Sequence, residues 1–474
     1  MPTEAATHDV VVIGGGPGGY AAALYGASCG LDVALIEQDK VGGTCLHRGC
    51  IPAKEFLETA AVWRTVGDAQ SFGVETGEAS IDFSVSQRRK AEVVDLLFKG
   101  LSATLKNRTV TVLEGRGYLA ADGTVSISGG ADDGTVLTAS RGVVLATGST
   151  PRTLPGLEVD GTLVVTSDEF LDLAHLPASA AVVGGGAIGC EFASMLSDLG
   201  CDVTIVEGLG SILAGCDAEV ASQVGRSFKK RSIGIITSAV VTGHVPSADG
   251  TSTTLSIEGA DGIDVEMVVV SVGRQPATDG LVDETVGVAT DERGFVVADG
   301  HQRTTAAGVW AVGDIVAGSP QLAHVAFAEA MVAIKDMLGE PAVPVDYARV
   351  PWAIYCHPEV AFAGLTEAQA KDQGFDVVTK KDPFGGNGRA RIIGETEGMV
   401  KVVAERRPDG TAGRVLGVHM VGPWVTEQLG AGYLAVNWEA NVDEVASLIQ
   451  PHPSLSETFG ETMIALTGRG LHVG

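Results

Sequence analysis

Residues 9–37 read DVVVIGGGPGGYAAALYGASCGLDVALIE, and residues 179–207 read SAAVVGGGAIGCEFASMLSDLGCDVTIVE. In each copy a short apolar run ends in G-x-G-x-x-G, an amphipathic stretch follows, and a second apolar run ends in a glutamate. This order is typical of the strand, tight turn, helix and strand that bind a dinucleotide. Finding it twice disfavours glycine-rich turns without ligands. The glycines are Gly14, Gly16 and Gly19 in the first copy, and Gly184, Gly186 and Gly189 in the second.

The glutamate that ends each copy predicts what the site binds. Glu37 and Glu207 are placed to accept hydrogen bonds from ribose hydroxyls, while the glycines let a pyrophosphate approach a helix N-terminus. Two such sites in one chain indicate two different dinucleotides, one held and one exchanged. Because an acid at Glu207 would repel the 2′-phosphate of NADP, the second site is expected to take NAD.

Length and charge argue against several classes of protein. A chain of 474 residues is too long for one hydrophobic core and predicts several domains. A net charge of −27 argues against a nucleic-acid partner. The N-terminus has no apolar signal core, and glycines and Glu191 interrupt the most apolar window, 180–196. A membrane span is therefore not expected, and a cytoplasmic location is.

The remaining segments are consistent with this layout. Residues 80–106 have helical spacing, whereas residues 108–147 alternate apolar and polar between glycine-rich turns and predict short antiparallel strands. The runs VVLATGS (143–149) and VWAVGD (309–314) predict strands that end where a cofactor could be contacted. After about residue 346, alternating strands and helical runs predict a separate α/β domain.

The stretch GGTCLHRGCIPAK, residues 42–54, places Cys45 and Cys50 five positions apart. Spacing alone leaves a structural crosslink, a metal pair and a redox pair open. A bridge over so short a loop adds little stability, and no second Cys/His pair with metal-ligand spacing lies nearby. A helix N-terminus and Lys54 would stabilise a thiolate, which favours redox chemistry beside the first nucleotide motif. The other cysteines are expected to be small buried residues: Cys29, Cys190, Cys201, Cys216 and Cys356.

Further motifs follow in order: LATGS, SVGRQP, VWAVGDIVAGSPQLAH, HPEVAFAGLTE and HPSLSETFGE. With them the sequence resembles the class I pyridine-nucleotide disulfide oxidoreductases nearly end to end. The resemblance implies an α/β fold with two Rossmann-like dinucleotide-binding domains, for FAD and NAD, and a C-terminal α/β dimerisation domain. The implied ranges are 1–150 and 281–345 for the FAD-binding domain, 151–280 for the NAD-binding domain and 346–474 for the dimerisation domain.

The resemblance also implies roles for single residues. Cys45 would exchange with substrate, and Cys50 would face the flavin. Lys54 would lie near flavin N5 and pair with Glu191. The first motif would hold FAD together with Gly117, Asp314 and Ala323, and the second would hold NAD together with Val241 and Gly273.

In the same way, His452 and Glu457 resemble a catalytic base and the carboxylate that orients it. The chemistry supports this pair, because a thiol attacks only as thiolate and a histidine titrates near neutral pH. A carboxylate on the other ring nitrogen fixes the tautomer. The resemblance implies that this base comes from the partner subunit of a homodimer. A second His-Pro, His357-Pro358, is assigned no catalytic role.

The activity that the resemblance implies is oxidation of protein-bound dihydrolipoamide by NAD⁺ through the cysteine pair and FAD. Its partners would be lipoyl domains of 2-oxo-acid dehydrogenase or glycine-cleavage complexes. A reductase of another small disulfide, such as mycothione reductase, is the nearest alternative, and Glu207 opposes the NADPH that such enzymes usually prefer. A docking component of a multienzyme core and a flavin diaphorase are further alternatives.

The redox stretch departs from the family pattern at three positions. His47 and Arg48 stand where Asn-Val is commonest, and Ala53 stands where Ser or Thr is frequent. Since the cysteines are kept, these departures are expected to tune redox potential or substrate access, with activity retained.

Overall fold

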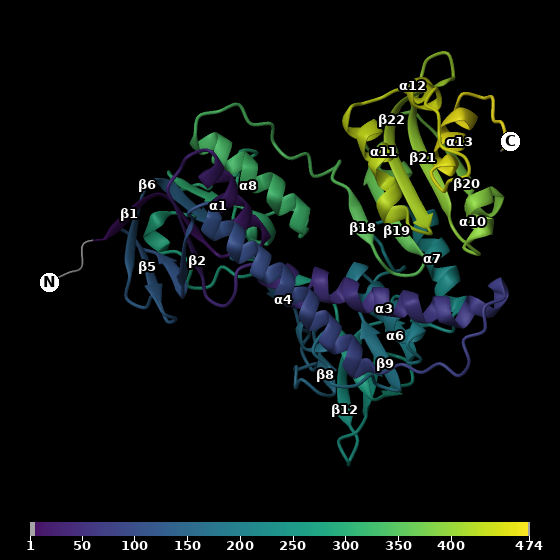
Figure 1. Cartoon of the computed structure of the whole chain (residues 1–474), viewed down its shortest axis with the longest axis horizontal. Helices are drawn as coiled ribbons and strands as arrows, with labels where there is room; N and C mark the ends of the chain where they lie inside the picture. The colour runs from purple at the N-terminus through teal and green to yellow at the C-terminus, as the bar shows by residue number, and fades with distance from the viewer. Residues whose placement is uncertain (1–4, 473–474) are drawn as a thin grey trace. The chain divides into compact units, whose positions relative to one another are not determined.

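The computed structural model describes residues 5–472, which form two compact units. The first comprises the chain up to Glu55 together with Ser84–Arg152 and Gly273–Tyr347. The second comprises Phe56–Phe83, Thr153–Val272 and the chain from Ala348 onward. Figure 1 shows the elements of each unit, and the four domain ranges expected from sequence stay a prediction.

A seven-stranded sheet forms the centre of the first unit, in the order β3-β2-β1-β6-β5-β4 with β17 paired to β6. Its parallel part contains β1 (Ala6–Ile13), β2 (Val33–Glu37), β3 (Thr111–Glu114), β6 (Val136–Leu145) and β17 (Val309–Ala311). Helices α1 (Pro17–Ser28) and α8 (Ala323–Met337) pack side by side (Figure 1). Alternate residues of β1 and β2 pack into two different cores, one on each face of the sheet, so both strands read as apolar runs.

The prediction of short antiparallel strands over 108–147 is correct only in part. Strands β4 (Arg116–Leu119) and β5 (Val125–Ser128) are antiparallel, and β5 pairs antiparallel with the start of β6. However, β3 pairs parallel with β2, and β6 pairs parallel with β1. The parallel pairings join segments distant in sequence, so local alternation could not indicate them. The helix expected at 80–106 is confirmed as α4 (Phe83–Asn107).

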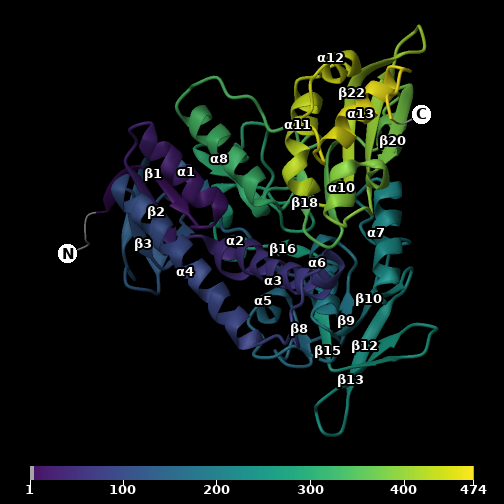
Figure 2. The ribbon, with the colours of Figure 1, turned by 45° about the vertical axis from the view of Figure 1, so that its right-hand side comes forward.

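The second unit contains a five-stranded parallel sheet in the order β11-β10-β9-β15-β8. Its strands are β8 (Val164–Val165), β9 (Ser179–Val183), β10 (Asp202–Val206), β11 (Gly234–Ile236) and β15 (Met267–Val270). Helix α6 (Ala187–Asp198) joins β9 to β10, and α7 (Ala218–Lys230) joins β10 to β11. Figure 2 shows the hairpin of β12 (Val241–Pro246) and β13 (Thr253–Ile257) extending from this region, with β14 (Ile263–Val265) completing its small sheet.

The same unit carries a five-stranded antiparallel sheet in the order β18-β19-β22-β21-β20. Its strands are β18 (Trp352–Ile354), β19 (Glu359–Gly364), β20 (Val377–Pro383), β21 (Met399–Arg406) and β22 (Ala412–Gly422). Helices α11 (Val425–Asn437), α12 (Val442–Ala446) and α13 (Glu457–Leu466) pack their apolar faces into one core with this sheet. The α/β segment expected after residue 346 is therefore confirmed.

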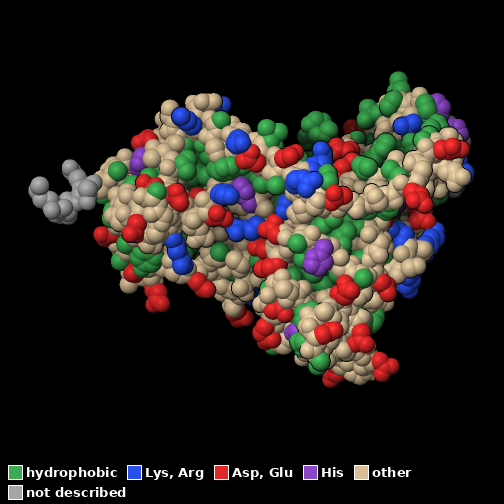
Figure 3. Space-filling model, turned by 60° about the horizontal axis from the view of Figure 1, so that its bottom comes forward, with side chains coloured by type: hydrophobic (Ala, Val, Ile, Leu, Met, Phe, Trp, Pro, Cys, Tyr) green, Lys and Arg blue, Asp and Glu red, His purple; other side chains and the backbone are tan. Residues whose placement is uncertain are grey.

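Surface properties agree with the composition. Acidic side chains are scattered over the face shown in Figure 3, with basic side chains among them. Among residues 5–472, no helix is long and apolar enough to cross a membrane. Cys190, Cys201 and Cys356 are buried as expected and Cys216 is half-buried, but the expectation is wrong for Cys29. Cys29 is exposed because it lies just past the end of α1, where the chain turns at the surface.

Candidate active site

The first glycine turn has the backbone that its sequence predicts. Gly14 has φ +103°, and a Cβ there would lie 2.4 Å from the Ala146 carbonyl oxygen. A Cβ on Gly19 would lie 1.7 Å from the Gly14 carbonyl oxygen, so this approach of helix to strand requires glycine. Gly16 caps the N-terminus of α1, and no side chain of the described residues accepts a hydrogen bond there. The first-turn N–H groups of α1 thus fit an anionic pyrophosphate.

The second glycine turn repeats this geometry in the other unit. Gly184 has φ +105°, with a Cβ position 2.5 Å from the Ser271 carbonyl oxygen. A Cβ on Gly189 would lie 1.9 Å from the Gly184 carbonyl oxygen. Gly186 caps α6, again without a side-chain acceptor among the described residues. The second turn therefore fits the same ligand chemistry as the first.

Each glutamate at the strand end is held against its own glycine turn. Glu37 Oε2 accepts the Gly15 N–H at 2.6 Å, and Oε1 accepts the Asp39 N–H at 2.9 Å. Glu207 Oε2 accepts the Gly185 N–H at 2.6 Å. Its Oε1 accepts the Leu209 N–H at 2.7 Å. Both carboxylates are fixed in place, and each oxygen can accept a further hydrogen bond, as ribose recognition requires.

The cysteine pair occupies a break between two helices. Helix α2 (Gly43–Arg48) carries Cys45, and α3 (Cys50–Asp68) begins at Cys50. Gly49 separates the helices with φ −149° and ψ −111°, and a Cβ there would lie 3.0 Å from the Thr44 carbonyl oxygen. This is the departure from a regular helix that brings the two sulfurs together.

The two thiols hydrogen-bond each other. This bond, together with burial and the charge of Cys50, raises the pKa of Cys45, and Lys54 opposes the rise only in part. The expectation that a helix N-terminus and Lys54 stabilise a thiolate is therefore wrong for Cys45 when both cysteines are thiols. Among the described residues, no group of three or more His, Cys, Asp and Glu could hold a metal ion, so the metal interpretation has no support there.

Tyr20 is a residue that sequence reasoning missed. It follows Gly19 on α1, and burial together with the charges of Cys45 and Cys50 raises its pKa to about 12. Its ring contacts that of Phe327 on α8, with ring centroids 5.7 Å apart. The Tyr20 phenol therefore stays neutral beside the thiols. Only its position after the glycine turn could have drawn attention to it.

The structure accounts for His47 and Arg48. His47 Nε2 donates a hydrogen bond to the Val41 carbonyl oxygen at 3.0 Å, and its ring packs edge-on against Phe98. Arg48 forms an ion pair with Asp39 at 2.9 Å. Both side chains fasten α2 to the segment after Glu37 and to α4. Tuning of redox potential or substrate access by these residues stays a prediction.

Asp314 lies in a polar network at the end of β17. Its Oδ2 accepts the Ser149 hydroxyl at 2.5 Å, and Ser149 Oγ accepts Arg274 Nε–H at 2.7 Å. The Gly313 N–H donates to the buried carboxylate of Glu329 at 2.6 Å, which fixes the turn that presents Asp314. Asp314, Ser149 and Arg274 belong to VWAVGDIVAGSPQLAH, LATGS and SVGRQP, respectively. The network therefore joins three quoted motifs through contacts that sequence order alone did not indicate.

The other predicted nucleotide contacts are distributed over both units. Gly117 lies in β4, where a Cβ would meet Ile13 Cγ2 at 2.8 Å, and Ala323 is the first residue of α8. Val241 begins β12 in the second unit, whereas Gly273, with φ +104°, belongs to the first. Their nucleotide contacts stay predictions.

Lys54 and Glu191 belong to different compact units, so their pairing stays a prediction. Glu191 is buried on α6, and its Oε1 accepts the Tyr355 N–H at 2.9 Å. This contact fastens α6 to the segment beside β18 within the second unit.

His452 and Glu457 are brought together at the start of α13. His452 Nδ1 lies 2.7 Å from Glu457 Oε1, and Glu457 Oε2 accepts the Ser454 N–H at 2.7 Å. Burial alone would raise the pKa of Glu457, but the hydrogen bonds from Ser454 and His452 outweigh it and lower the pKa. The His452 side chain is 80 % exposed, so its ring can be presented to another molecule.

The second His-Pro has the opposite environment. Burial, with Arg64 and Arg231 nearby, lowers the pKa of His357 to about 3. Its backbone carbonyl accepts a hydrogen bond from Arg231 at 2.6 Å, and its N–H donates to Ser194. His357 is therefore a neutral residue held by Arg231 and Ser194, and its lack of a catalytic role stays a prediction.

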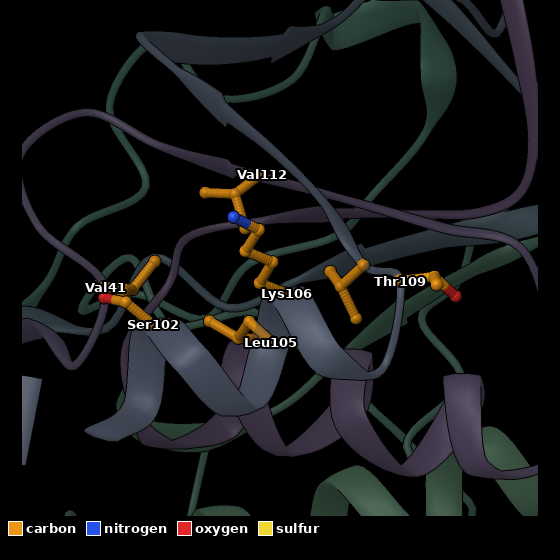
Figure 4. A pocket seen from close by; sticks show the side chains of 7 residues that line it. Val41, Ser102, Leu105, Lys106, Thr109 and Val112 are labelled. Atoms are coloured by element: carbon orange, nitrogen blue, oxygen red, sulfur yellow. The ribbon is translucent and has the colours of Figure 1, made fainter. Parts of the chain in front are cut away.

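A cavity of about 360 Å³ lies elsewhere in the first unit, between α4 and β3 (Figure 4). Figure 4 shows Lys106 extending along Val112 from the end of α4. The described residues that line this cavity include none of the predicted site residues. It is distinct from the cysteine pair.

Comparison with known proteins gives the family. The description "Pyridine nucleotide-disulphide oxidoreductase" matches residues 8–330, and the dimerisation domain of the same family matches residues 350–463. The chain belongs to this family. The expected fold class, with dinucleotide-binding and dimerisation domains, is thereby confirmed.

The pyridine nucleotide-disulphide oxidoreductases similar to this chain include dihydrolipoyl dehydrogenases. That of Bacillus subtilis is 41% identical over 484 residues and that of Rhizobium etli 38% over 489, with 99% or more of each chain covered. Among solved structures, LpdA of Mycobacterium tuberculosis has a TM-score of 0.89 at 27% identity, covering 97% of this chain and 99% of that one. The HOCl-induced flavoprotein disulfide reductase RclA of Escherichia coli has a TM-score of 0.84 at 27% identity, covering 96% and 99%.

Membership of the pyridine nucleotide-disulphide oxidoreductases implies use of a flavin and a pyridine nucleotide. The matched dimerisation domain fits a homodimer.

Proposed function

We propose that this protein oxidises protein-bound dihydrolipoamide to lipoamide with NAD⁺. The observation that carries the proposal is the hydrogen-bonded pair Cys45 and Cys50, at the break between α2 and α3 and directly after the first dinucleotide motif. The substrate follows from relatives that span the whole chain and are named dihydrolipoyl dehydrogenase.

In this proposal the first motif holds FAD and the second holds NAD. The fit rests on glycine turns that a side chain would fill, and on carboxylates fixed beside them. Glu37 would bind the ribose of FAD. Asp314 at the end of β17, which accepts a hydrogen bond from Ser149, would be a further contact to FAD. Glu207 would accept from both ribose hydroxyls of NAD and repel the phosphate of NADP. Bound FAD supplies the route by which an electron pair passes from the cysteines to NAD⁺.

The sulfur chemistry uses the chain's own residues. A thiolate of dihydrolipoamide attacks Cys45 Sγ of the Cys45–Cys50 disulfide, the S–S bond breaks, and the Cys50 thiolate leaves. The second substrate thiol then attacks the sulfur joined to Cys45, which releases cyclic lipoamide and leaves Cys45 reduced. The substrate loses two electrons and the cysteine pair gains them. Lys54 and the N-terminus of α3 stabilise the Cys50 thiolate.

His452 accepts the proton that makes the substrate thiol nucleophilic. Glu457 on Nδ1 holds the ring so that Nε2 accepts the proton, and its charge stabilises the imidazolium. The high exposure of His452 supports its delivery to the cysteine pair of a partner subunit in a homodimer. The base and the disulfide of one active site would then come from two chains.

The lipoyl domains of 2-oxo-acid dehydrogenase or glycine-cleavage complexes are the proposed substrates. A cytoplasmic location is part of the proposal.

Steady-state assays with matched substrate pairs test this function. Dihydrolipoamide with NAD⁺ is expected to turn over much faster than a small disulfide, mycothione included, with NADPH. Faster NADPH-driven disulfide reduction would overturn the proposal in favour of a low-molecular-weight disulfide reductase. Quinone reduction without any lipoamide turnover would overturn it in favour of a diaphorase.

A further inference from the structure

A buried lysine lies at the centre of an ion network in the second unit. The Lys401 side chain on β21 is only 4 % exposed, and its Nζ lies 2.9 Å from Asp217 Oδ2. It also lies 3.0 Å from Glu219 Oε2 and 3.0 Å from Glu367 Oε2. Three carboxylates from two separate segments of the chain thus converge on one ammonium group. Asp217 is buried with Lys401, so water screens their contact little, whereas Glu219 and Glu367 are partly exposed.

Two exposed lysines complete the charge balance. Lys371 contacts Glu367 Oε1 at 2.6 Å, and Lys381 contacts Glu219. Their side chains are 58 % and 56 % exposed, so water screens both contacts. Of the three lysines, Lys401 is the one that contacts Asp217 in the described structure.

Asp217 ends the segment that follows Glu207. It caps α7 by accepting the Glu219 N–H at 3.0 Å, and it is buried with Lys401. The segment 208–216 between Glu207 and Asp217 touches the second glycine turn directly. Its Leu213 N–H donates to the Gly185 carbonyl oxygen at 2.8 Å. Ile212 packs so closely that a Cβ on Gly185 would lie 2.8 Å from Ile212 Cγ2.

We infer that Lys401 is a positioning residue for the second dinucleotide site. Lys401 fixes Asp217, and Asp217 fixes the end of segment 208–216. That segment in turn holds the Gly185 carbonyl through the Leu213 N–H. A residue of the antiparallel sheet thereby sets the geometry of a turn more than 200 positions earlier in the chain. The inference rests on the proposed function insofar as this turn binds NAD.

Loss of the ammonium group would leave Asp217, Glu219 and Glu367 facing one another. Their repulsion would move Asp217 away from β21 and release segment 208–216 from the glycine turn. The N–H groups of α6 and the Glu207 carboxylate would then be less well placed for a nucleotide. The cysteine pair belongs to the other unit, so its exchange with a dithiol is expected to be unaffected.

Lys401→Met in the full-length flavin-loaded protein tests this inference, with Lys371→Met as the matched control. Lys371 belongs to the same network but is exposed and contacts only Glu367 among the three acids. We expect Lys401→Met to raise the Kd for NAD⁺, measured by calorimetry, about tenfold. The rate of reduction by dihydrolipoamide in a stopped-flow instrument should stay unchanged. Lys371→Met should change neither quantity.

Asp217→Asn covers the case in which Lys401→Met does not fold. Asparagine keeps the helix cap but removes the charge that Lys401 contacts. A weaker affinity for NAD⁺ with unchanged reduction by dithiol supports the inference for either variant. A folded variant with wild-type affinity for NAD⁺ overturns it, as does an equal loss of both quantities. Because NAD⁺ binding is measured directly, a wild type that binds NAD⁺ without oxidising dihydrolipoamide would contradict only the proposed function.

Discussion

The two dinucleotide motifs share one backbone geometry but lead into different segments. In the first, the Gly42 N–H donates to the Gly15 carbonyl oxygen at 2.8 Å, and the chain then enters the helix that carries Cys45. In the second, the Leu213 N–H makes the equivalent bond to Gly185 at the same distance, and the chain then reaches Asp217. We call residues 38–49 the first connector and residues 208–217 the second connector.

The difference lies in what each connector carries. The first connector ends at the break between α2 and α3, where a second thiol meets Cys45. The second connector also contains a cysteine, Cys216, but burial and the adjacent Asp217 raise its pKa to about 12. In the proposed function, one copy of the motif therefore leads to redox chemistry and the other to a structural anchor. Both glycine turns would bind a nucleotide, and the connector would decide which further role lies beside that nucleotide.

Replacing the connector cysteines gives the largest expected effect. Cys45→Ser removes the sulfur proposed to exchange with substrate and should lower kcat for dihydrolipoamide by at least about a thousandfold. Cys216→Ser is the matched change in the second connector and should leave kcat near that of the wild type. Steady-state kinetics measure both. Similar losses in the two variants would remove the distinction between the connectors.

The two glycine turns should respond alike in stability and differently in ligand binding. Alanine at Gly19 or Gly189 places a Cβ within 2 Å of a carbonyl oxygen, which should lower the free energy of unfolding by about 1–3 kcal/mol. Gly19→Ala should also release flavin, whereas Gly189→Ala should weaken NAD⁺ binding and retain flavin. Denaturant unfolding and flavin absorbance measure these changes.

Gly100→Ala is the control for the glycine substitutions. Gly100 is exposed within α4, and none of the described residues has an atom within 4 Å of its Cβ position, apart from its neighbours in the helix. Alanine there should raise stability by about 0.5–1 kcal/mol. Loss of flavin from Gly189→Ala, with NAD⁺ binding intact, would reverse the assignment of the two motifs.

Replacing the glutamate of either motif should distinguish the two nucleotide sites. The expected effect is smaller than that of the cysteine or glycine substitutions. Glu207→Gln loses charge-assisted hydrogen bonds to the ribose and should raise the Kd for NAD⁺ about tenfold. The preference for NAD⁺ over NADP⁺ should narrow, because the repelling charge is gone. Glu37→Gln should leave this preference unchanged. An unaltered coenzyme preference in Glu207→Gln would show that another group excludes NADP⁺.

Acid should weaken the ion network around Lys401, which holds the end of the second connector, and this is the smallest expected effect. Hydrogen bonds from Lys381 and Lys371 chiefly lower the pKa of Glu219 and of Glu367, respectively, below the ordinary 4.5, and Lys401 adds to both. Since their folded pKa is depressed, these carboxylates stabilise the fold above about pH 4.5 and lose that contribution as pH falls through the lowered values. Thermal unfolding followed from neutral pH to about pH 3 measures this loss of stability. The Lys371→Met/Lys381→Met variant should show a shallower decline, and an unchanged decline would contradict this origin.

Much of the fold and of the site could be predicted because the determinants are local. Gly19 is required by its contact with Gly14 five positions earlier, and Glu37 follows at a fixed distance along the chain. The cysteine pair is likewise contained in one short stretch. Local patterns of this kind can be recognised from the sequence. The histidine–glutamate pair at 452 and 457 is a further example.

Other features depend on contacts between distant segments. The bond between Lys401 and Asp217 spans 184 positions, and neither residue has a sequence context that indicates the other. The parallel pairing of β2 with β3 joins residues more than 70 positions apart and was predicted wrongly. The position of Tyr20 beside the two cysteines depends on the packing of α1 and is not indicated by the sequence around it. Tertiary packing determines these contacts, and no local sequence pattern indicates them.

The most direct test of the redox assignment follows the two cysteines themselves. The oxidised holoenzyme is treated anaerobically with a stoichiometric amount of dihydrolipoamide, alkylated, digested and mapped by mass spectrometry, with and without subsequent NAD⁺. We predict that Cys45 and Cys50 become alkylated after dithiol treatment and are protected as a disulfide again after NAD⁺ is added. Alkylation that does not change at these two positions, or that changes at Cys216 instead, would contradict the account.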